Sequence, residues 1–235
     1  MRQCLAKRSQ PALSPINPEI LKAGPHHCLA MCLTVLKEFA AAREAYEAAL
    51  TADPASFAVR FDFARFESND RPVEALKLLN QLASEVPSEP RVWQLGAQIA
   101  LSRPEYAAFA CDWTSEAVKN CPDNEAILLQ RAEALMLNQQ LDEARPVWKS
   151  VSVSARQRAA LALCELVTGG DISPISAQDE PAISQEAIHW CRQWIRYSAH
   201  SVLFQVHERM EKIRLTLPRF VQIWEKANQQ ARVAA

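Results

Sequence analysis

Small and apolar side chains recur at helical spacing along most of this chain, and prolines interrupt them at nearly regular intervals. The segment AAREAYEAALTADP, residues 41–54, carries Ala42, Tyr46 and Ala49 on one helix face and ends at Pro54. Proline cannot continue a helix, because it lacks a backbone N–H and its ring clashes with the preceding turn. The pattern therefore predicts a helix that stops just before Pro54.

The same ending recurs further along the chain. Pro87 follows Pro54 by 33 residues, and Pro122 follows Pro87 by 35. A period this regular indicates an internal repeat. Upstream of each proline, small and large residues fall at corresponding places, and a fourth copy follows without a closing proline. The four sets are Ala42, Tyr46 and Ala49; Ala75, Leu79 and Leu82; Ala110, Thr114 and Ala117; and Ala144, Trp148 and Val151.

The first half of each repeat also carries a matching pair of residues. These pairs are Leu29 and Ala30, Phe63 and Ala64, Leu95 and Gly96, and Arg131 and Ala132. Two antiparallel helices need a small residue where their backbones approach closely, and larger residues on either side to fill the space. Each repeat is therefore predicted to be a pair of antiparallel helices.

This pattern resembles the tetratricopeptide repeat, a helix–turn–helix unit of about 34 residues. The resemblance covers roughly residues 23–156, in four units. It implies an all-α fold, a right-handed superhelix of antiparallel helix pairs, whose concave surface is lined by the first helix of each unit. We predict a flexible leader over residues 1–20, the repeat array over 21–156, and a degenerate helical hairpin with C-terminal capping helices over 157–235.

Beyond the repeats, one helix is predicted to end at Gly169 and Gly170, and a polar, proline-containing loop follows it. The last segment has an a/d heptad stripe over 203–224, which Pro218 interrupts. The stripe consists of Leu203, Val206, Met210, Ile213, Leu217, Phe220 and Trp224. Two interpretations remain: a cap that covers the open end of the array, or the seam of a homo-oligomer.

Composition narrows the possible classes of protein. The formal net charge of −1 over 235 residues argues against nucleic acid as a partner. The apolar runs are shorter than a membrane span requires, and the N-terminus lacks the apolar core of a signal peptide. The seven cysteines are an odd number, and most lie in predicted helices among apolar neighbours. We interpret them as reduced core residues and predict a cytoplasmic protein.

Candidate chemistry is sparse. Cys28 and Cys32 lie four residues apart beside His26 and His27, but no second paired motif supplies the remaining ligands of a metal site. There is no glycine-rich phosphate loop, nucleophile elbow or H-E-x-x-H motif. We therefore predict no catalytic residue, no metal and no cofactor.

The resemblance places eight side chains on the concave groove. They are His27, Met31, Phe61, Arg65, Trp93, Leu129, Glu133 and Met136. Where such grooves clamp the C-terminal carboxylates of chaperones, these positions hold Lys, Arg and Asn, whereas here only Arg65 is basic. The set suits an apolar helix or an extended peptide. An equal alternative is that the chain's own C-terminal helices fill the groove.

These observations predict a non-catalytic scaffold or adaptor that binds another protein or peptide. Repeat arrays of this kind often follow catalytic domains, and some bacterial glycosyltransferases resemble that arrangement. The second hypothesis is therefore an accessory repeat region for a transferase or another catalytic partner, encoded separately or upstream. A third is a homo-oligomeric scaffold that uses the 203–224 stripe.

Overall fold

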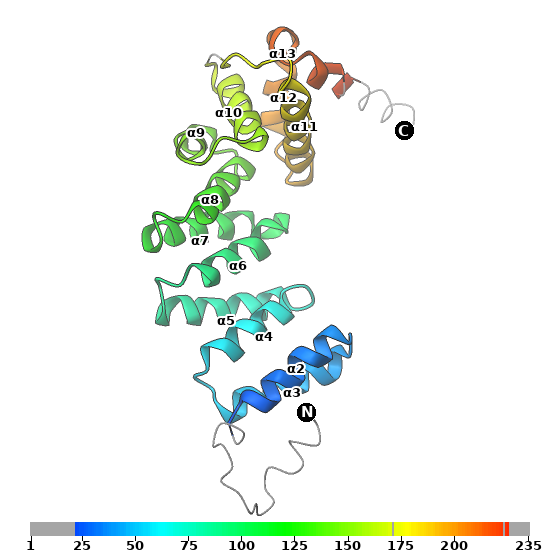
Figure 1. Cartoon of the computed structure of the whole chain (residues 1–235). Coiled ribbons are helices and arrows are strands. Elements are labelled where there is room, and N and C mark those ends of the chain that lie inside the picture. The colour runs from blue at the N-terminus through cyan, green and yellow to red at the C-terminus, as the bar shows by residue number, and fades with distance from the viewer. Residues whose placement is uncertain (1–21, 171, 223, 226–235) are drawn as a thin grey trace, which may run out of the picture. The chain divides into compact units, whose positions relative to one another are not determined.

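The computed structural model describes residues 22–170, 172–222 and 224–225. Helices joined by turns, and by one longer loop between Thr168 and Glu180, make up this part of the chain, and it contains no β-strand (Figure 1). The chain divides into two compact units, one ending at Ile99 and one beginning at Ala100. The all-α fold of antiparallel helix pairs predicted from the repeats is confirmed.

The first unit consists of two helix pairs and most of a further helix. Its elements are α2 (Gly24–Val35), α3 (Phe39–Ala52), α4 (Phe57–Glu67), α5 (Pro72–Glu85) and α6 (Pro90–Leu101), which ends just beyond the boundary. Helix α2 packs on α3, and α4 packs on α5. The second unit contains α7 (Ala107–Asn120), α8 (Glu125–Leu137), α9 (Leu141–Ser150), α10 (Ala155–Thr168), α11 (Glu180–Arg196), α12 (His200–Glu208) and α13 (Met210–Thr216), with a 3₁₀ turn at Pro104–Tyr106.

The small residues of the repeat pattern and the larger ones on the second helices lie in the core. Ala30, Ala64 and Ala132, on the first helices of their pairs, have no exposed surface. The sets on the second helices are likewise buried: Ala42, Tyr46 and Ala49; Ala75, Leu79 and Leu82; Ala110, Thr114 and Ala117; and Ala144, Trp148 and Val151. The close approach of paired helices thus explains why small residues recur at these positions.

The prolines end the second helices by a shared backbone geometry. Asp53, Val86 and Cys121 follow the last residues of α3, α5 and α7, and each precedes a proline. All three have extended φ, between −150° and −132°, and each donates its N–H to the carbonyl four residues back. The residue before proline avoids the helical region, so the helix stops there.

The core of the second unit is rich in tryptophan. Trp148 and Trp190 meet edge to face with ring centroids 6.0 Å apart. Trp194 is fully buried and donates its indole N–H to the carbonyl of Met136 at 2.9 Å. A buried indole needs such a partner, so this bond ties α11 to the end of α8.

The heptad stripe packs into this same core. Five of its members are buried, namely Val206, Met210, Ile213, Leu217 and Phe220, and the other two, Leu203 and Trp224, are partly buried against them. The helix is broken at Arg209 and again at Leu217, just before Pro218. Within the described residues, the stripe therefore packs against the chain's own helices. The cap over the open end of the array and the homo-oligomer seam both stay predictions.

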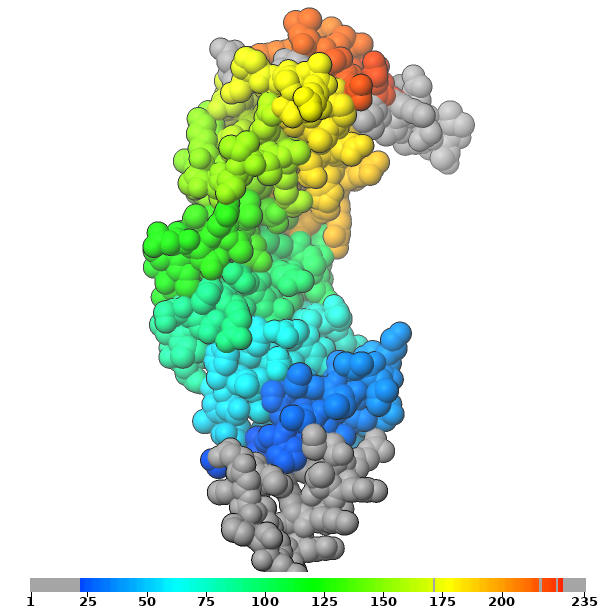
Figure 2. All heavy atoms as spheres, viewed as in Figure 1, coloured from blue at the N-terminus to red at the C-terminus, as the bar shows by residue number. Residues whose placement is uncertain are grey.

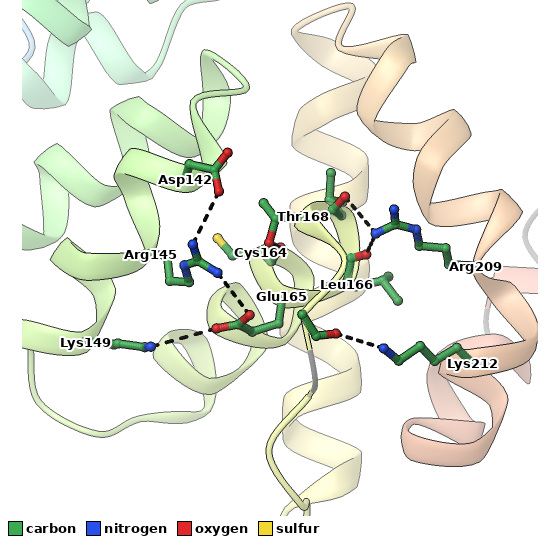
Figure 3. A network of polar contacts seen from close by, with 11 residues as sticks. Asp142, Arg145, Lys149, Cys164, Glu165, Leu166, Thr168, Arg209 and Lys212 are labelled. Atoms are coloured by element: carbon green, nitrogen blue, oxygen red, sulfur yellow. Dashed lines mark hydrogen bonds and ion pairs between the residues drawn. The ribbon is translucent and has the colours of Figure 1, made fainter.

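Basic side chains of the last helices hold the C-terminal end of α10. Arg209 donates to the carbonyls of Leu166 and, at 2.7 Å, Val167. Lys212 donates to the carbonyl of Gly170 at 2.8 Å (Figure 3). The final carbonyls of a helix have no partner within the helix, and cations are stabilised there. Together with Gly169, whose φ of 88° ends the helix in the left-handed region, these contacts fix the turn after α10.

Two predictions about organisation remain predictions. The boundary between 156 and 157 and the right-handed superhelical course both concern how repeat units follow one another. The predicted leader, residues 1–20, and the last ten residues of the chain lie outside the described residues.

Candidate binding groove

A groove of about 540 Å³ opens in the first unit between α2, the start of α3 and α4. Three of the predicted site residues come together here: Met31 and Arg65 line the groove, and His27 is bound to another lining residue, Asp62. The lining residues are Met31, Thr34, Val35, Phe39, Arg43, Tyr46, Asp62, Arg65, Phe66, Asn69 and Asp70.

One wall of the groove is apolar and open to solvent. Met31 is 48% exposed, Val35 81% and Phe39 55%. Figure 2 shows the blue atoms of α2 and α3, which carry these side chains, at the surface of this unit. Large apolar residues grouped in this way commonly mark a binding surface, whereas single exposed ones do not.

The floor of the groove is aromatic. Tyr46 is buried, and its ring centroid lies 5.3 Å from that of the half-buried Phe66. Phe39 reaches the same ring from the groove edge, with centroids 6.4 Å apart. Burial raises the pKa of Tyr46, and a hydrogen bond with Thr34 partly opposes the rise. The hydroxyl therefore stays protonated across the physiological range, and the floor is uncharged.

The charged side chain of Arg43 lies at one end of the groove. Its Nε donates to Glu67 Oε1 at 2.7 Å and its Nη2 donates to Asp70 Oδ2 at 3.0 Å. The Glu67 side chain is 1% exposed, so the pair is largely removed from water. These two hydrogen bonds raise the pKa of Arg43 above its already high value. The guanidinium also lies 5.6 Å from the Phe66 ring centroid, a cation–π contact between Arg43 and the aromatic floor.

At the other end, Asp62 joins two of the predicted residues. Its Oδ2 lies 3.0 Å from His27 Nε2, and its Oδ1 lies 3.4 Å from Arg65 Nη1. The Arg65 side chain is 60% exposed, and its guanidinium lies 4.9 Å from the Phe61 ring centroid. Asp62 and the Phe61 ring thus orient the guanidinium of Arg65, while most of the side chain stays open to solvent.

Two predicted aromatic residues of the same unit lie beneath the surface. Phe61 is buried and stacks on Phe57 with centroids 5.8 Å apart. Trp93 is also buried and donates its indole N–H to the carbonyl of Pro87 at 2.7 Å. In this structure they support the surface, and their role as contacts for a partner stays a prediction.

The remaining predicted residues belong to the second unit. Met136 is fully buried, and Leu129 is half-buried against the same core. Glu133 lies 2.7 Å from Arg156, whose guanidinium is 5.1 Å from the Trp190 ring centroid. Burial raises the pKa of Glu133, and the neighbouring Arg156 opposes that rise. Of the three, Leu129 and Glu133 keep some exposed surface in this unit.

The assignment of groove residues by repeat position omitted several residues that line the groove. Val35 and Phe39 flank the turn between α2 and α3, and Arg43 lies on α3, so the rule that the first helix of each unit lines the groove passes over Phe39 and Arg43. Phe66 lies near the end of α4, one residue beyond Arg65. The available signal was the run TVLKEF, residues 34–39, in which apolar side chains continue through a predicted turn.

The described residues show neither of two other kinds of site. Among them, no group of three or more His, Cys, Asp or Glu side chains is placed to hold a metal ion. No helix in this part of the chain is long and apolar enough to cross a membrane.

Comparison with known proteins places the α3 and α4 sides of the groove within a recognised family segment, whereas Met31, Thr34 and Val35 precede it. Residues 36–99 match the family model of the tetratricopeptide repeat, and this segment contains α3 and α4. No curated protein sequence matches the chain significantly.

Three solved structures have a similar arrangement of helices. PilF of Pseudomonas aeruginosa is 18% identical, with a TM-score of 0.53 over 78% of this chain and 84% of PilF. A thermophilic tetratricopeptide repeat protein of Thermus thermophilus is 18% identical, with a TM-score of 0.45 over 77% of this chain and 99% of that one. A mutant of MamA is 14% identical, with a TM-score of 0.44 over 82% and 99%. At these identities only the likeness to PilF is informative, and it concerns the fold alone. Residues 36–99 are thus recognised as a tetratricopeptide repeat segment, within a chain whose described residues have the confirmed fold of antiparallel helix pairs.

Proposed function

We propose that this chain is a non-catalytic adaptor and that the groove of its first unit binds a helix or an extended peptide of a partner protein. The matched segment supports this proposal, because tetratricopeptide repeat proteins generally mediate protein–protein interactions. The observation that carries the proposal is the exposed apolar wall of Met31, Val35 and Phe39 above an aromatic floor.

The apolar wall accounts for affinity. An apolar side chain of a partner that reached the floor would be removed from water between Phe39 and Phe66. Burying one such side chain contributes about 1.5–3 kcal/mol. Two or three anchors, spaced at i, i+3 or i+4, and i+7 on a partner helix, would follow the groove in the usual mode of helix recognition.

The charged ends account for orientation. Arg65 is mostly exposed, and Asp62 contacts only its Nη1, at 3.4 Å. The other N–H groups of the oriented guanidinium can therefore receive a carboxylate of the partner at little conformational cost. Arg43 is already bound by Glu67 and Asp70, so it shapes the other end of the groove and has less freedom to pair with a ligand. The partner is therefore expected to carry an acidic residue beside its apolar anchors, at the Arg65 end.

A capture experiment with paired variants tests this function. Val35→Glu places a charge on the exposed wall, where it should not disturb folding. Val153→Glu is the matched control, because Val153 is 79% exposed and lies in the second unit. Circular dichroism would first confirm equal helicity of both variants and the wild type.

The expected result is a lysate protein that the wild type and the control capture and that Val35→Glu loses. Arg65→Glu should weaken the same complex, and a compensating acid-to-lysine change in the partner should restore it. If Val35→Glu captures the partner as well as the wild type does, the interface is elsewhere and the groove proposal is wrong.

A further inference from the structure

The outer face of α2 carries two exposed thiols within an apolar surface. Cys28 and Cys32 are both exposed, although the sequence led us to expect core cysteines. The opposite face of the helix, with Ala30 and Leu33, is the one that is buried against α3. Cysteine is among the residue types most often fully buried, so two exposed cysteines on one helix face are unusual.

The two thiols have the spacing of a chelating pair. Residues four apart lie on the same helix face with Cβ atoms about 5–6 Å apart, whereas a disulfide needs about 3.5–4.5 Å. Their side chains can converge instead on one metal ion, since Zn–S bonds are about 2.3 Å long. A closed zinc site needs four ligands, and within the described residues no third His, Cys, Asp or Glu joins this pair. The pair can therefore supply two of the four ligands that such a site needs.

The lack of charge on the exposed face of α2 indicates what can supply the other two ligands. Residues 24–36 contain no Asp, Glu, Lys or Arg, and the first charges come at Lys37 and Glu38. A like face opposite this one would therefore meet no like-charge repulsion. Leu36, 65% exposed, extends the apolar surface one turn beyond Cys32.

An antiparallel pairing of two α2 helices fits the residues in register. When Cys28 of one copy lies opposite Cys32 of the other, the two-fold axis brings all four thiols together. The same register places Leu36 opposite Gly24, which is exposed and has no side chain to obstruct it. A closed two-fold contact uses the same surface on both copies, as this arrangement does.

We propose that two copies of the chain pair through their α2 helices and that Cys28 and Cys32 of both copies bind one Zn²⁺ as four thiolates. Each thiol loses its proton to solvent on binding, the metal keeps its oxidation state, and no oxidant is required. Cys28, Cys32 and Leu36 are not among the residues that line the proposed groove, although Met31 and Val35 of the same helix are.

The test is a zinc titration of the full-length chain, reduced with a phosphine and freed of metal. Light scattering would give the mass and elemental analysis the bound metal. We expect the mass to double on addition of Zn²⁺, with one Zn²⁺ bound per two chains. Co²⁺ in place of Zn²⁺ should give the absorption bands of tetrahedral thiolate coordination.

Matched cysteine variants locate the site. Cys28→Ser/Cys32→Ser should lose both the bound metal and the dimer. Cys111→Ser/Cys121→Ser, which changes two half-exposed cysteines in the second unit, should keep both. Cys4→Ser should also keep both, which excludes Cys4 as a ligand.

A variant of the apolar contact tests the pairing of the two copies. Leu36→Glu retains all the thiols but disturbs this contact. It should weaken zinc binding by at least about tenfold, since each copy then offers only two ligands.

Four results would overturn the proposal. They are a chain that stays monomeric with Zn²⁺, a stoichiometry of one Zn²⁺ per chain, a Cys28→Ser/Cys32→Ser variant that behaves as the wild type, and a Leu36→Glu variant that dimerises as the wild type does. None of these depends on capture of a partner in the groove, so the two proposals can fail separately.

Discussion

The two units of this chain build the same kind of helix pair but treat their apolar surfaces differently. In the first unit, Met31, Val35 and Phe39 face solvent around a groove. In the second, the apolar stripe from Val206 to Phe220 lies inside the core, against α10 and α11. The last helices cover the apolar stripe of the second unit, whereas the apolar side chains around the groove of the first unit stay exposed.

The residues that stabilise the fold and those proposed to bind a partner are therefore concentrated in different units. The second unit has fully buried tryptophans and a capped α10, so its helices are held by packing and by side-chain hydrogen bonds to backbone carbonyls. The first unit, by contrast, has charged groups beside an open aromatic surface. Removing a buried contact in the second unit should therefore lower the free energy of unfolding. Removing an exposed side chain in the first unit should change it little.

Thiol labelling should show the largest contrast. Cys28 and Cys32 are exposed, whereas Cys164 and Cys191 are buried. Burial raises the pKa of Cys164 to about 12 and that of Cys191 further still, so at pH 8 almost no thiolate forms at either position. With a chelator present, we expect iodoacetamide to modify the first pair faster than the second by on the order of a thousandfold, because the core must open first. Mass spectrometry of peptides measures the rates, and equal rates would show that the second core is not closed.

Loss of the buried indole should be the largest change in stability. Trp194→Ala removes a fully buried side chain and the hydrogen bond to Met136, and should lower the free energy of unfolding by about 3–5 kcal/mol. Phe39→Ala, at an exposed aromatic of the first unit, should change it by no more than about 0.5 kcal/mol. Urea denaturation followed by circular dichroism measures both variants. Similar losses in the two would contradict the division between a packed and an open unit.

The buried carboxylate of the first unit should give an intermediate effect. Glu67→Gln keeps the shape of the side chain but removes the charge that faces Arg43, at 2.7 Å, and Arg71, at 3.7 Å. We expect a loss of about 1–3 kcal/mol, the usual range for a buried hydrogen bond to a charged group. Glu44→Gln, on the exposed side of α3, is the control and should be nearly neutral. Equal effects in a urea titration would mean that the Glu67 cluster does not hold the first unit together.

The turn after α10 should give the smallest effect. Gly169 has φ of 88°, and a Cβ there would lie 3.9 Å from the nearest nitrogens of Arg209, so the strain of a substitution comes from the backbone alone. Gly169→Ala should cost about 1–2 kcal/mol, and Gly169→Asn less, because Asn adopts the left-handed region more readily. Thermal unfolding distinguishes the two variants. An alanine variant that is as stable as the asparagine one would show that this turn relaxes.

The sequence predicted the pairing of helices well for a definite reason. Small residues such as Ala30 and Ala64 recur because paired backbones approach closely at one place in every unit, and this requirement is local and periodic. Pro54, Pro87 and Pro122 act on the residue immediately before them, so helix ends are also local. The end of α10 at Gly169 follows the same logic.

The candidate site depended on information that no single segment contains. Periodicity placed Phe61 and Met136 on groove-facing helices, but neighbours distant in sequence bury both side chains. Periodicity also placed Cys28 and Cys32 in an apolar helix, α2. Only the position of α3 shows that the two cysteines lie on the side of α2 that α3 does not cover.

The sequence by itself thus determined the repeat, the helix pairs, their ends and the apolar stripe near the C-terminus. The tertiary structure decided which apolar faces are covered: the stripe packs into the second core, while Val35 and Phe39 remain open beside Phe66. The physical reason is that spacing along a helix fixes which residues share a face, whereas the burial of that face depends on elements brought to it by the whole fold.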